Sequence, residues 1–245
     1  MRRAAAFAVA TVSLIGLTVD PAMAQEASLV SGLEGSLTSR SIQLFLLLTV
    51  ISLAPGIAIM ITCFPFLVTV FSILRQGLGL QNSPPNMLLI SLAMFLTYFV
   101  MEPVFTAAWE QGITPMLEEQ ITADVAFERT MDPFRMFMSN RMDPDTYTAL
   151  ASLRPDAAET QPGPDAPLSV LIPSFMLSEM SRAFQIGFLI FLPFLIIDLV
   201  VAAVLMSMGM MMVPPAIVSL PFKLSFFVLA DGWSLIAGAL VRSYF

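Results

Sequence analysis

Four long apolar stretches dominate the pattern of hydrophobic and polar positions along the chain. They run over Ile42 to Leu74, Met87 to Val104, Phe184 to Val213 and Leu224 to Val241. As an α-helix, each stretch is long enough to cross the roughly 30 Å hydrocarbon core of a bilayer. The pattern therefore predicts an all-α integral membrane protein whose apolar helices pair as hairpins.

Prolines inside these stretches predict helices that are kinked or broken. Pro55-Gly56 and Pro65 interrupt the first stretch, and Pro193 interrupts the third. A proline removes a backbone donor and clashes with the preceding helical turn. Broken helices in a membrane usually face protein or a water-filled path, because lipid offers no partner for the freed backbone groups. This favours a transport-type architecture over a simple anchor.

A polar segment from Trp109 to Leu177 separates the second and third apolar stretches and holds eleven acidic residues against four arginines. Apolar residues at near-helical spacing over Val125 to Asn140 predict a packed helix, so we expect a mostly helical segment. The run Ala157 to Pro167, rich in proline, glycine and acids, predicts a flexible loop. The positive-inside rule favours a periplasmic location for this acidic segment.

The amino terminus has the pattern of a cleavable signal peptide. Arg2 and Arg3 precede an apolar run from Ala4 to Leu17, and Ala22-Met23-Ala24 is a small-x-small cleavage motif. Cleavage between Ala24 and Gln25 starts the mature chain outside and independently places the acidic segment in the periplasm. A short first transmembrane helix is the alternative, but its apolar run is well below the roughly 20 residues that a span needs.

These features divide the chain into four regions. They are the signal peptide (1–24), a helical hairpin region with two apolar stretches (25–104), the acidic periplasmic segment (105–183) and a carboxy-terminal helical hairpin (184–245).

Composition narrows the possible function. The chain is 57% hydrophobic and 12% charged, whereas soluble domains hold about 45–50% apolar and about 25% charged residues. It has no histidine, which is the commonest general base and zinc ligand. The single cysteine, Cys63, allows no internal disulfide, and the net charge of −7 argues against a nucleic-acid partner. We expect neither an enzyme nor a bound metal or cofactor.

The run SMGMMMVPP from Ser207 to Pro215 predicts the turn of the carboxy-terminal hairpin. Pro214 and Pro215 cannot continue the preceding helix, which leaves Met210, Met211 and Met212 at the tip. Methionine side chains are unbranched and polarizable, so a cluster of them can conform to changing shapes and exclude water. Ordinary membrane packing is the alternative, and composition alone does not decide between the two.

Four ionisable residues, Glu179, Asp198, Lys223 and Asp231, lie within or beside apolar runs. A lone charge there costs several kcal/mol, so structural ion pairs are favoured over a proton relay. Folding the hairpin about Pro214 and Pro215 puts Asp198 level with Asp231, with Lys223 about 12 Å nearer the tip. We therefore expect Lys223 to lack a partner within its hairpin, and charges to be matched between subunits or across the kink at Pro193.

The sequence resembles the FliP family of flagellar and related type III secretion systems. The resemblance is carried by Ser178 to Trp233, by Leu74 to Val104 and by DPFRMFM at Asp132 to Met138. Two departures are visible. Phe64-Pro65-Phe66 stands where the family more often has Phe-Thr-Arg, and Met180-Ser181-Arg182 replaces a Leu-Lys-Thr type sequence.

The resemblance implies a core subunit of the type III export gate in the bacterial inner membrane, most simply at the flagellar basal body. FliP-family proteins form a homo-pentamer with FliQ and FliR type subunits, work with FlhB and FlhA type proteins, and pass unfolded substrates. Their methionine loop, which matches Met210 to Met212, is a gasket in the pore. The alternatives are an injectisome gate subunit, an ion-coupled transporter, for which no inverted repeat is visible, and an intramembrane protease using Asp198 and Asp231.

Overall fold

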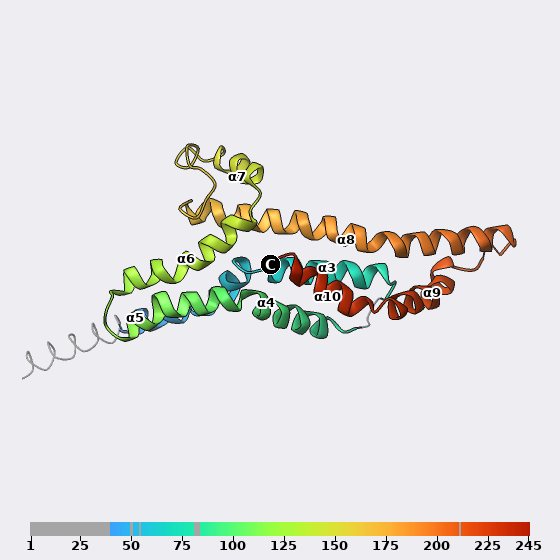
Figure 1. The fold of residues 1–245 in the computed structure, drawn as a ribbon, viewed down its shortest axis with the longest axis horizontal. Helices are drawn as coiled ribbons and strands as arrows, with labels where there is room; N and C mark the ends of the chain where they lie inside the picture. The colour runs from blue at the N-terminus through green and yellow to red at the C-terminus, as the bar shows by residue number, and fades with distance from the viewer. Residues whose placement is uncertain (1–39, 50, 54, 81–83, 211) are drawn as a thin grey trace, which may run out of the picture. The chain divides into compact units, whose positions relative to one another are not determined.

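The computed structural model describes residues 40–49, 51–53, 55–80, 84–210 and 212–245, in two units, Met1–Pro55 and Gly56–Phe245. The described residues form helices and turns with no strand, which confirms the all-α prediction (Figure 1). Within the part of the chain that the structure describes, three helices are long and apolar enough to cross a membrane, at Arg40–Met60, Asn86–Leu117 and Leu168–Ser207. The expected signal peptide and its cleavage site at Ala24 and Gln25 lie outside the described residues.

In the first apolar stretch, the described residues on either side of a turn at residues 61–63 are helical. Helix α3 (Phe64–Gly77) follows that turn, with Pro65 in its first turn. A proline is favoured there because the first amides of a helix have no intrahelical partner. The predicted interruption at Pro65 is thus confirmed as a helix start. α3 supplies the centre of the core of the larger unit, with five large apolar side chains buried: Phe66, Leu67, Val70, Phe71 and Leu74.

The second stretch forms one long helical segment. It comprises α4 (Asn86–Ala108), the π-helical segment η1 (Trp109–Ile113) and the short α5 (Thr114–Leu117). After a turn, α6 (Ala123–Arg141) returns and packs against α4 and η1. The prediction of a packed helix over Val125 to Asn140 is confirmed. Gly112 marks the closest approach, because a Cβ there would lie 2.0 Å from Thr130 Oγ1.

A short helix and a series of turns lead from α6 to the third stretch. α7 (Pro144–Ala151) is capped by Asp143, whose carboxylate accepts a hydrogen bond from the amide of Thr146 at 3.0 Å. The run from Ala157 to Pro167 is non-helical, which agrees with the predicted loop, whereas its flexibility stays a prediction. It is attached to α6 through Arg135, which donates to the carbonyl of Ala166 at 2.8 Å.

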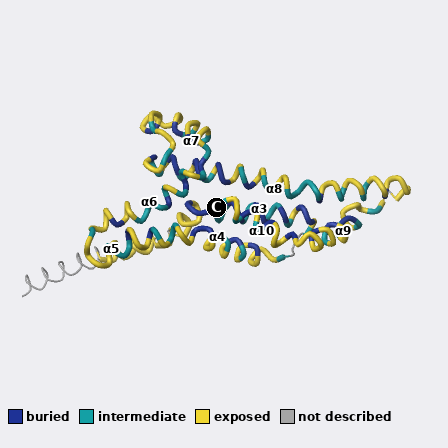
Figure 2. The backbone as a smooth tube through the Cα atoms, viewed as in Figure 1, coloured by how far each residue is buried: buried dark blue, intermediate teal, exposed yellow. Residues whose placement is uncertain are grey.

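The third stretch belongs to α8 (Leu168–Ser207), a continuous helix of 40 residues. It begins well before Phe184 and runs through Pro193, so Pro193 does not break the helix, and a kink there stays a prediction. At about 1.5 Å per residue α8 is about 60 Å long, twice the thickness of a hydrocarbon core. Its first half packs on α3, α6 and α7, while much of its far half is exposed (Figure 2).

The fourth stretch is divided between α9 (Pro215–Leu229) and α10 (Gly232–Arg242), which meet at a bend of 61°. The expectation of one helix over Leu224 to Val241 is therefore wrong. Asp231 forms the bend with a left-handed backbone (φ 48°), a conformation that aspartate tolerates better than most residues. The next residue must be small, because a Cβ on Gly232 would lie 2.2 Å from the Phe227 ring.

Candidate functional site: a methionine-tipped hairpin held by two ion-pair clusters

The α8–α9 hairpin presents the methionine run at its tip. α8 ends at Ser207 and α9 begins at Pro215, with the two helices in contact. Gly209 takes a positive φ of 75° in the intervening turn, and Pro214 and Pro215 start α9. The predicted hairpin is confirmed. The tip carries exposed Met210 and Met212, the latter 97% exposed, whereas Met211 lies outside the described residues.

Lys223 is buried and paired within this hairpin. Its Nζ lies 2.6 Å from Asp198 Oδ2 on α8 and 3.0 Å from the carbonyl oxygen of Gly77, which ends α3. Ser219 donates to the other Asp198 oxygen at 2.5 Å. The expectation that Lys223 lacks a partner in its own hairpin is therefore wrong. The cluster joins α3, α8 and α9 at one point.

The length of the turn explains this correction. Folding the chain about Pro214 and Pro215 assumes that helix continues to the prolines, but α8 stops at Ser207, and seven residues separate its end from Pro215. Counted from the helix ends, Asp198 lies nine residues before Ser207 and Lys223 eight residues after Pro215. The two residues are therefore level, and Asp231 is not level with Asp198.

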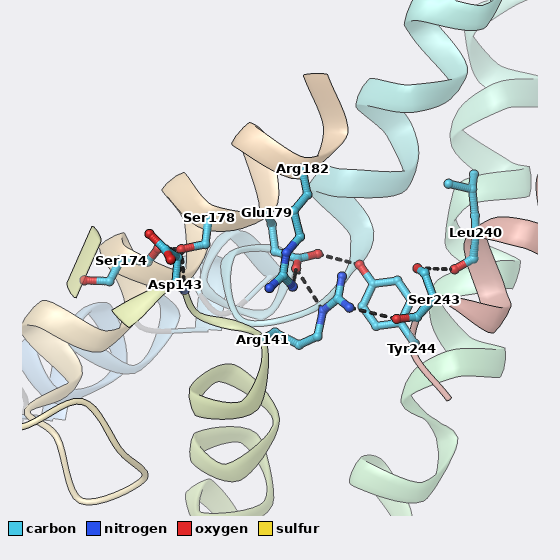
Figure 3. Close-up of polar contacts among 9 residues, drawn as sticks. All are labelled: Arg141, Asp143, Ser174, Ser178, Glu179, Arg182, Leu240, Ser243 and Tyr244. Carbon is cyan, nitrogen blue, oxygen red and sulfur yellow. Dashed lines mark hydrogen bonds and ion pairs between the residues drawn. The ribbon is translucent and has the colours of Figure 1, made fainter. Parts of the chain in front are cut away.

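A second cluster surrounds Glu179 on α8, which is 1% exposed (Figure 3). Arg141, at the end of α6, contacts the carboxylate through Nε at 3.0 Å, and Arg182 approaches it to 3.5 Å from one turn along α8. The hydroxyl of Tyr244 donates to the other carboxylate oxygen. Burial, together with the neighbouring Glu179 charge, raises the pKa of Tyr244 well above its usual range, so the hydroxyl stays protonated.

The second cluster ties the tail after α10 to α6 and α8. Arg141 donates to the carbonyl of Ser243 at 2.8 Å, and its guanidinium carbon lies 4.0 Å from the centre of the Tyr244 ring. On the other side, the amide of Asp143 donates to Ser178 on α8 at 2.9 Å. Figure 3 shows these residues converging from three separate elements.

The four expected buried charges thus form no single network. Glu179 belongs to one cluster, and Asp198 with Lys223 to the other. Asp231 is exposed at the α9–α10 bend, and no ion pair joins it to another described residue. Sequence reasoning missed Arg141 and Tyr244, which lie 38 and 65 positions from Glu179. Only Arg182, at the local i+3 spacing, carried a sequence signal.

An open apolar groove of about 460 Å³ runs between the far half of α8 and α9. Its lining is almost wholly aliphatic and aromatic, and includes Ile197, Val201, Leu205 and Phe222. Such a groove suits lipid chains or other helices and has no group for acid–base chemistry. Among the described residues, no cluster of three or more His, Cys, Asp or Glu is placed to hold a metal ion.

These helices define a polytopic, all-α membrane protein in which buried ion pairs fasten a long hairpin to the core. Comparison with known proteins then identifies its family. The chain matches the FliP family over residues 47–240 and belongs to that family, as the sequence resemblance suggested.

Three similar proteins are each named flagellar biosynthetic protein FliP. The Caulobacter vibrioides protein is 49% identical over 245 residues, covering 100% of this chain and 92% of that protein. The Agrobacterium fabrum protein is 52% identical over 215 residues, or 86% and 87% of the two chains. The Bacillus subtilis protein is 47% identical over 207 residues, or 84% and 93%.

Proposed function

We propose that this chain is a core subunit of the flagellar type III export gate in the bacterial inner membrane. Its membership of the FliP family, with relatives named as flagellar proteins over nearly their whole length, supports the flagellar role over an injectisome. The observation that carries the pore assignment is the long α8–α9 hairpin with exposed methionines at its tip.

The length of α8 supports a subunit that is partly raised out of the bilayer. At about 60 Å, the helix cannot lie wholly within a core of about 30 Å unless it tilts strongly. Its amino-terminal half carries the Glu179 cluster with Arg141 and Arg182, and two partly exposed guanidinium groups are costly in lipid. The acidic segment around α6 and α7 is then periplasmic, as the positive-inside rule and the signal peptide suggest.

Exposed apolar surface supports assembly with other subunits. Large side chains on the far half of α8 and on α9 are exposed, among them Leu195, Leu199, Ile217 and Phe222. We assign these faces to further copies in a homo-pentamer and to FliQ and FliR type subunits, with the remainder facing lipid. FlhB and FlhA type proteins would then deliver unfolded flagellar components to this gate.

The methionine tip is then the gasket of the pore. Repeated around a ring, the thioethers of Met210, Met211 and Met212 would meet across the lumen and close it against ions. The same flexible side chains would deform around any residue of a passing polypeptide. This role uses packing alone and needs no catalytic group.

Deletion of the gene tests the flagellar assignment. The deletion strain should lose motility and export of flagellar components, and the full chain expressed in trans should restore both. Purified complex provides an independent measure, because a gate subunit should run as a ring-sized oligomer, whereas an ion-coupled transporter would run as a monomer or dimer with solute uptake. A motile deletion strain or a monomeric transporter would refute the proposal.

A further inference from the structure

The bent helix pair α9–α10 is attached to α8 at two separate carboxylates. Lys223 on α9 pairs with Asp198, and Tyr244, beyond the end of α10, donates to Glu179. Both carboxylates belong to the continuous helix α8. They are 19 positions apart on that helix, which corresponds to about 28 Å.

The spacing of the two attachment points fits the bend between them. Lys223 and Tyr244 are 21 positions apart, and a straight helix would separate them by about 31 Å. A bend of 61° at Asp231 shortens this path to about 27 Å. The bent path therefore matches the distance between Asp198 and Glu179, whereas a straight path is longer by about 3 to 4 Å.

Tyr244 contacts several elements through its ring and its hydroxyl. Its ring packs edge-on against Phe66 of α3 at 5.6 Å and stacks on Phe137 of α6 at 6.1 Å. Arg141 lies over the ring, and the hydroxyl reaches Glu179 on α8. This one side chain thus connects the tail to α3, α6 and α8.

We propose that Tyr244 is a positioning residue, whose hydroxyl fastens the end of α10 to Glu179 and, together with the Lys223–Asp198 pair, fixes the bend between α9 and α10. The ring alone would hold the tail near the core, since its aromatic contacts do not need the hydroxyl. The hydroxyl makes the attachment specific to Glu179. This role concerns the geometry of one subunit and holds whether or not the subunit serves export.

The test measures the α8–α10 distance in the assembled full chain. Cys63, the only cysteine, is replaced by alanine, and spin labels are placed on cysteines at two exposed positions, Leu189 on α8 and Leu235 on α10. Labelled chains are diluted into unlabelled ones, so that pulsed electron resonance reports distances within one subunit. The variants are Tyr244→Phe, which removes only the hydroxyl, and Tyr244→Ala. Phe245→Ala, at the exposed neighbouring residue, is the matched control.

We expect Tyr244→Phe to broaden the Leu189–Leu235 distance distribution and Tyr244→Ala to shift its mean, because the 61° bend is then no longer held at both ends. Phe245→Ala should match the parent. In a Glu179→Leu background, which removes the acceptor, Tyr244→Phe should add no further change, because the hydroxyl acts through that carboxylate. An unchanged distribution in Tyr244→Phe, or an equal added change beside Glu179→Leu, would overturn the proposal. Export assays are not needed for this result, so its failure leaves the proposed gate function standing.

Discussion

Lys223 and Asp198 are buried to different extents, and the difference makes their pairing testable. The lysine side chain is 7% exposed and the aspartate side chain 35% exposed, with 2.6 Å between their charged atoms. Removing the partner of the more buried charge is costly, on the order of 3–5 kcal/mol, because that charge stays desolvated. The carboxylate left alone would be partly solvated, and its cost is smaller.

We therefore expect Asp198→Leu to destabilise the assembled protein by about 3–5 kcal/mol and Lys223→Met to destabilise it less. Thermal unfolding in detergent, followed by native gels for the assembled fraction, measures both. The double variant is the control, because replacing both charges with apolar groups of similar volume is often close to neutral. Equal losses in the two single variants, or an additive loss in the double variant, would contradict the pairing.

Asp143 gives a prediction about pH. Hydrogen bonds from the side chain and amide of Thr146 lower the pKa of this carboxyl. Because the folded-state pKa lies below the unfolded value of about 3.9, the charged cap favours folding above that pH and loses its effect as the pH falls through the folded-state pKa. Amide exchange of the peptide containing α7, corrected for intrinsic rates, should show protection that drops below about pH 4.

The control for this cap is Asp143→Asn, which keeps an acceptor oxygen at the α7 N-terminus but has no charge to titrate. Protection of α7 in Asp143→Asn should change little across the same pH range. The same acid-dependent drop in both proteins would mean that another group causes it.

At the scale of elements, the sequence predicted which helices exist better than where they end. The apolar stretches and the spacing in Val125 to Asn140 located the spans and α6, because one buried face leaves a periodic signal. Of the kink or break predicted at Pro193, the break is absent, since a proline costs one hydrogen bond but the remaining hydrogen bonds of a 40-residue helix persist. The bend at Asp231 was not predicted. Asp231 and Gly232 lie inside an apolar run, where Asp231 was interpreted as a buried charge and the Asp-Gly pair was not interpreted as a turn.

Gly112, at the contact between η1 and α6, leaves less room for an added Cβ than any other described glycine. A Cβ on Gly112 would lie 2.0 Å from Thr130 Oγ1 and 2.7 Å from the Thr130 backbone nitrogen. The backbone cannot move aside as a flexible side chain can, so Gly112→Ala should cost about 1–3 kcal/mol by overpacking. Gly163→Ala is the matched control, because nothing lies within 4 Å of its added Cβ. Comparable unfolding temperatures for the two variants would show that η1 and α6 separate easily.

At the scale of the whole molecule, the sequence predicted the family and the hairpin, but none of the partners in the Glu179 cluster. Arg141 and Tyr244 reach Glu179 from positions far away in the chain, and neither helical periodicity nor hairpin arithmetic reports such contacts. The partner of Lys223 was not predicted for a different reason. Which residues of α8 and α9 lie level depends on the seven residues between Ser207 and Pro215, and hydropathy does not show that both helices exclude them. The function was predicted from the family resemblance. The pattern of charged residues alone did not predict it.

The proposed sealing role of the methionine tip is a prediction about the assembled gate. Replacing Met210, Met211 and Met212 with alanine should leave the hairpin intact, because Gly209, Pro214 and Pro215 still form the turn. Several heavy atoms are lost from each side chain, and a ring repeats that loss around the lumen. Permeability of cells to ions and small solutes should therefore rise before export falls.

Leucine at the same three positions distinguishes sealing of the pore against ions from adaptability to the side chains of a passing substrate. Leucine keeps the apolar volume of methionine but is branched and less flexible, so it should hold the seal better than alanine while slowing the passage of substrates. Ion permeability and export are measured together, at matched amounts of assembled complex, for the methionine, leucine and alanine proteins. If the alanine protein assembles normally, leaks no more than the parent and exports at the parental rate, these methionines serve only to pack the hairpin tip.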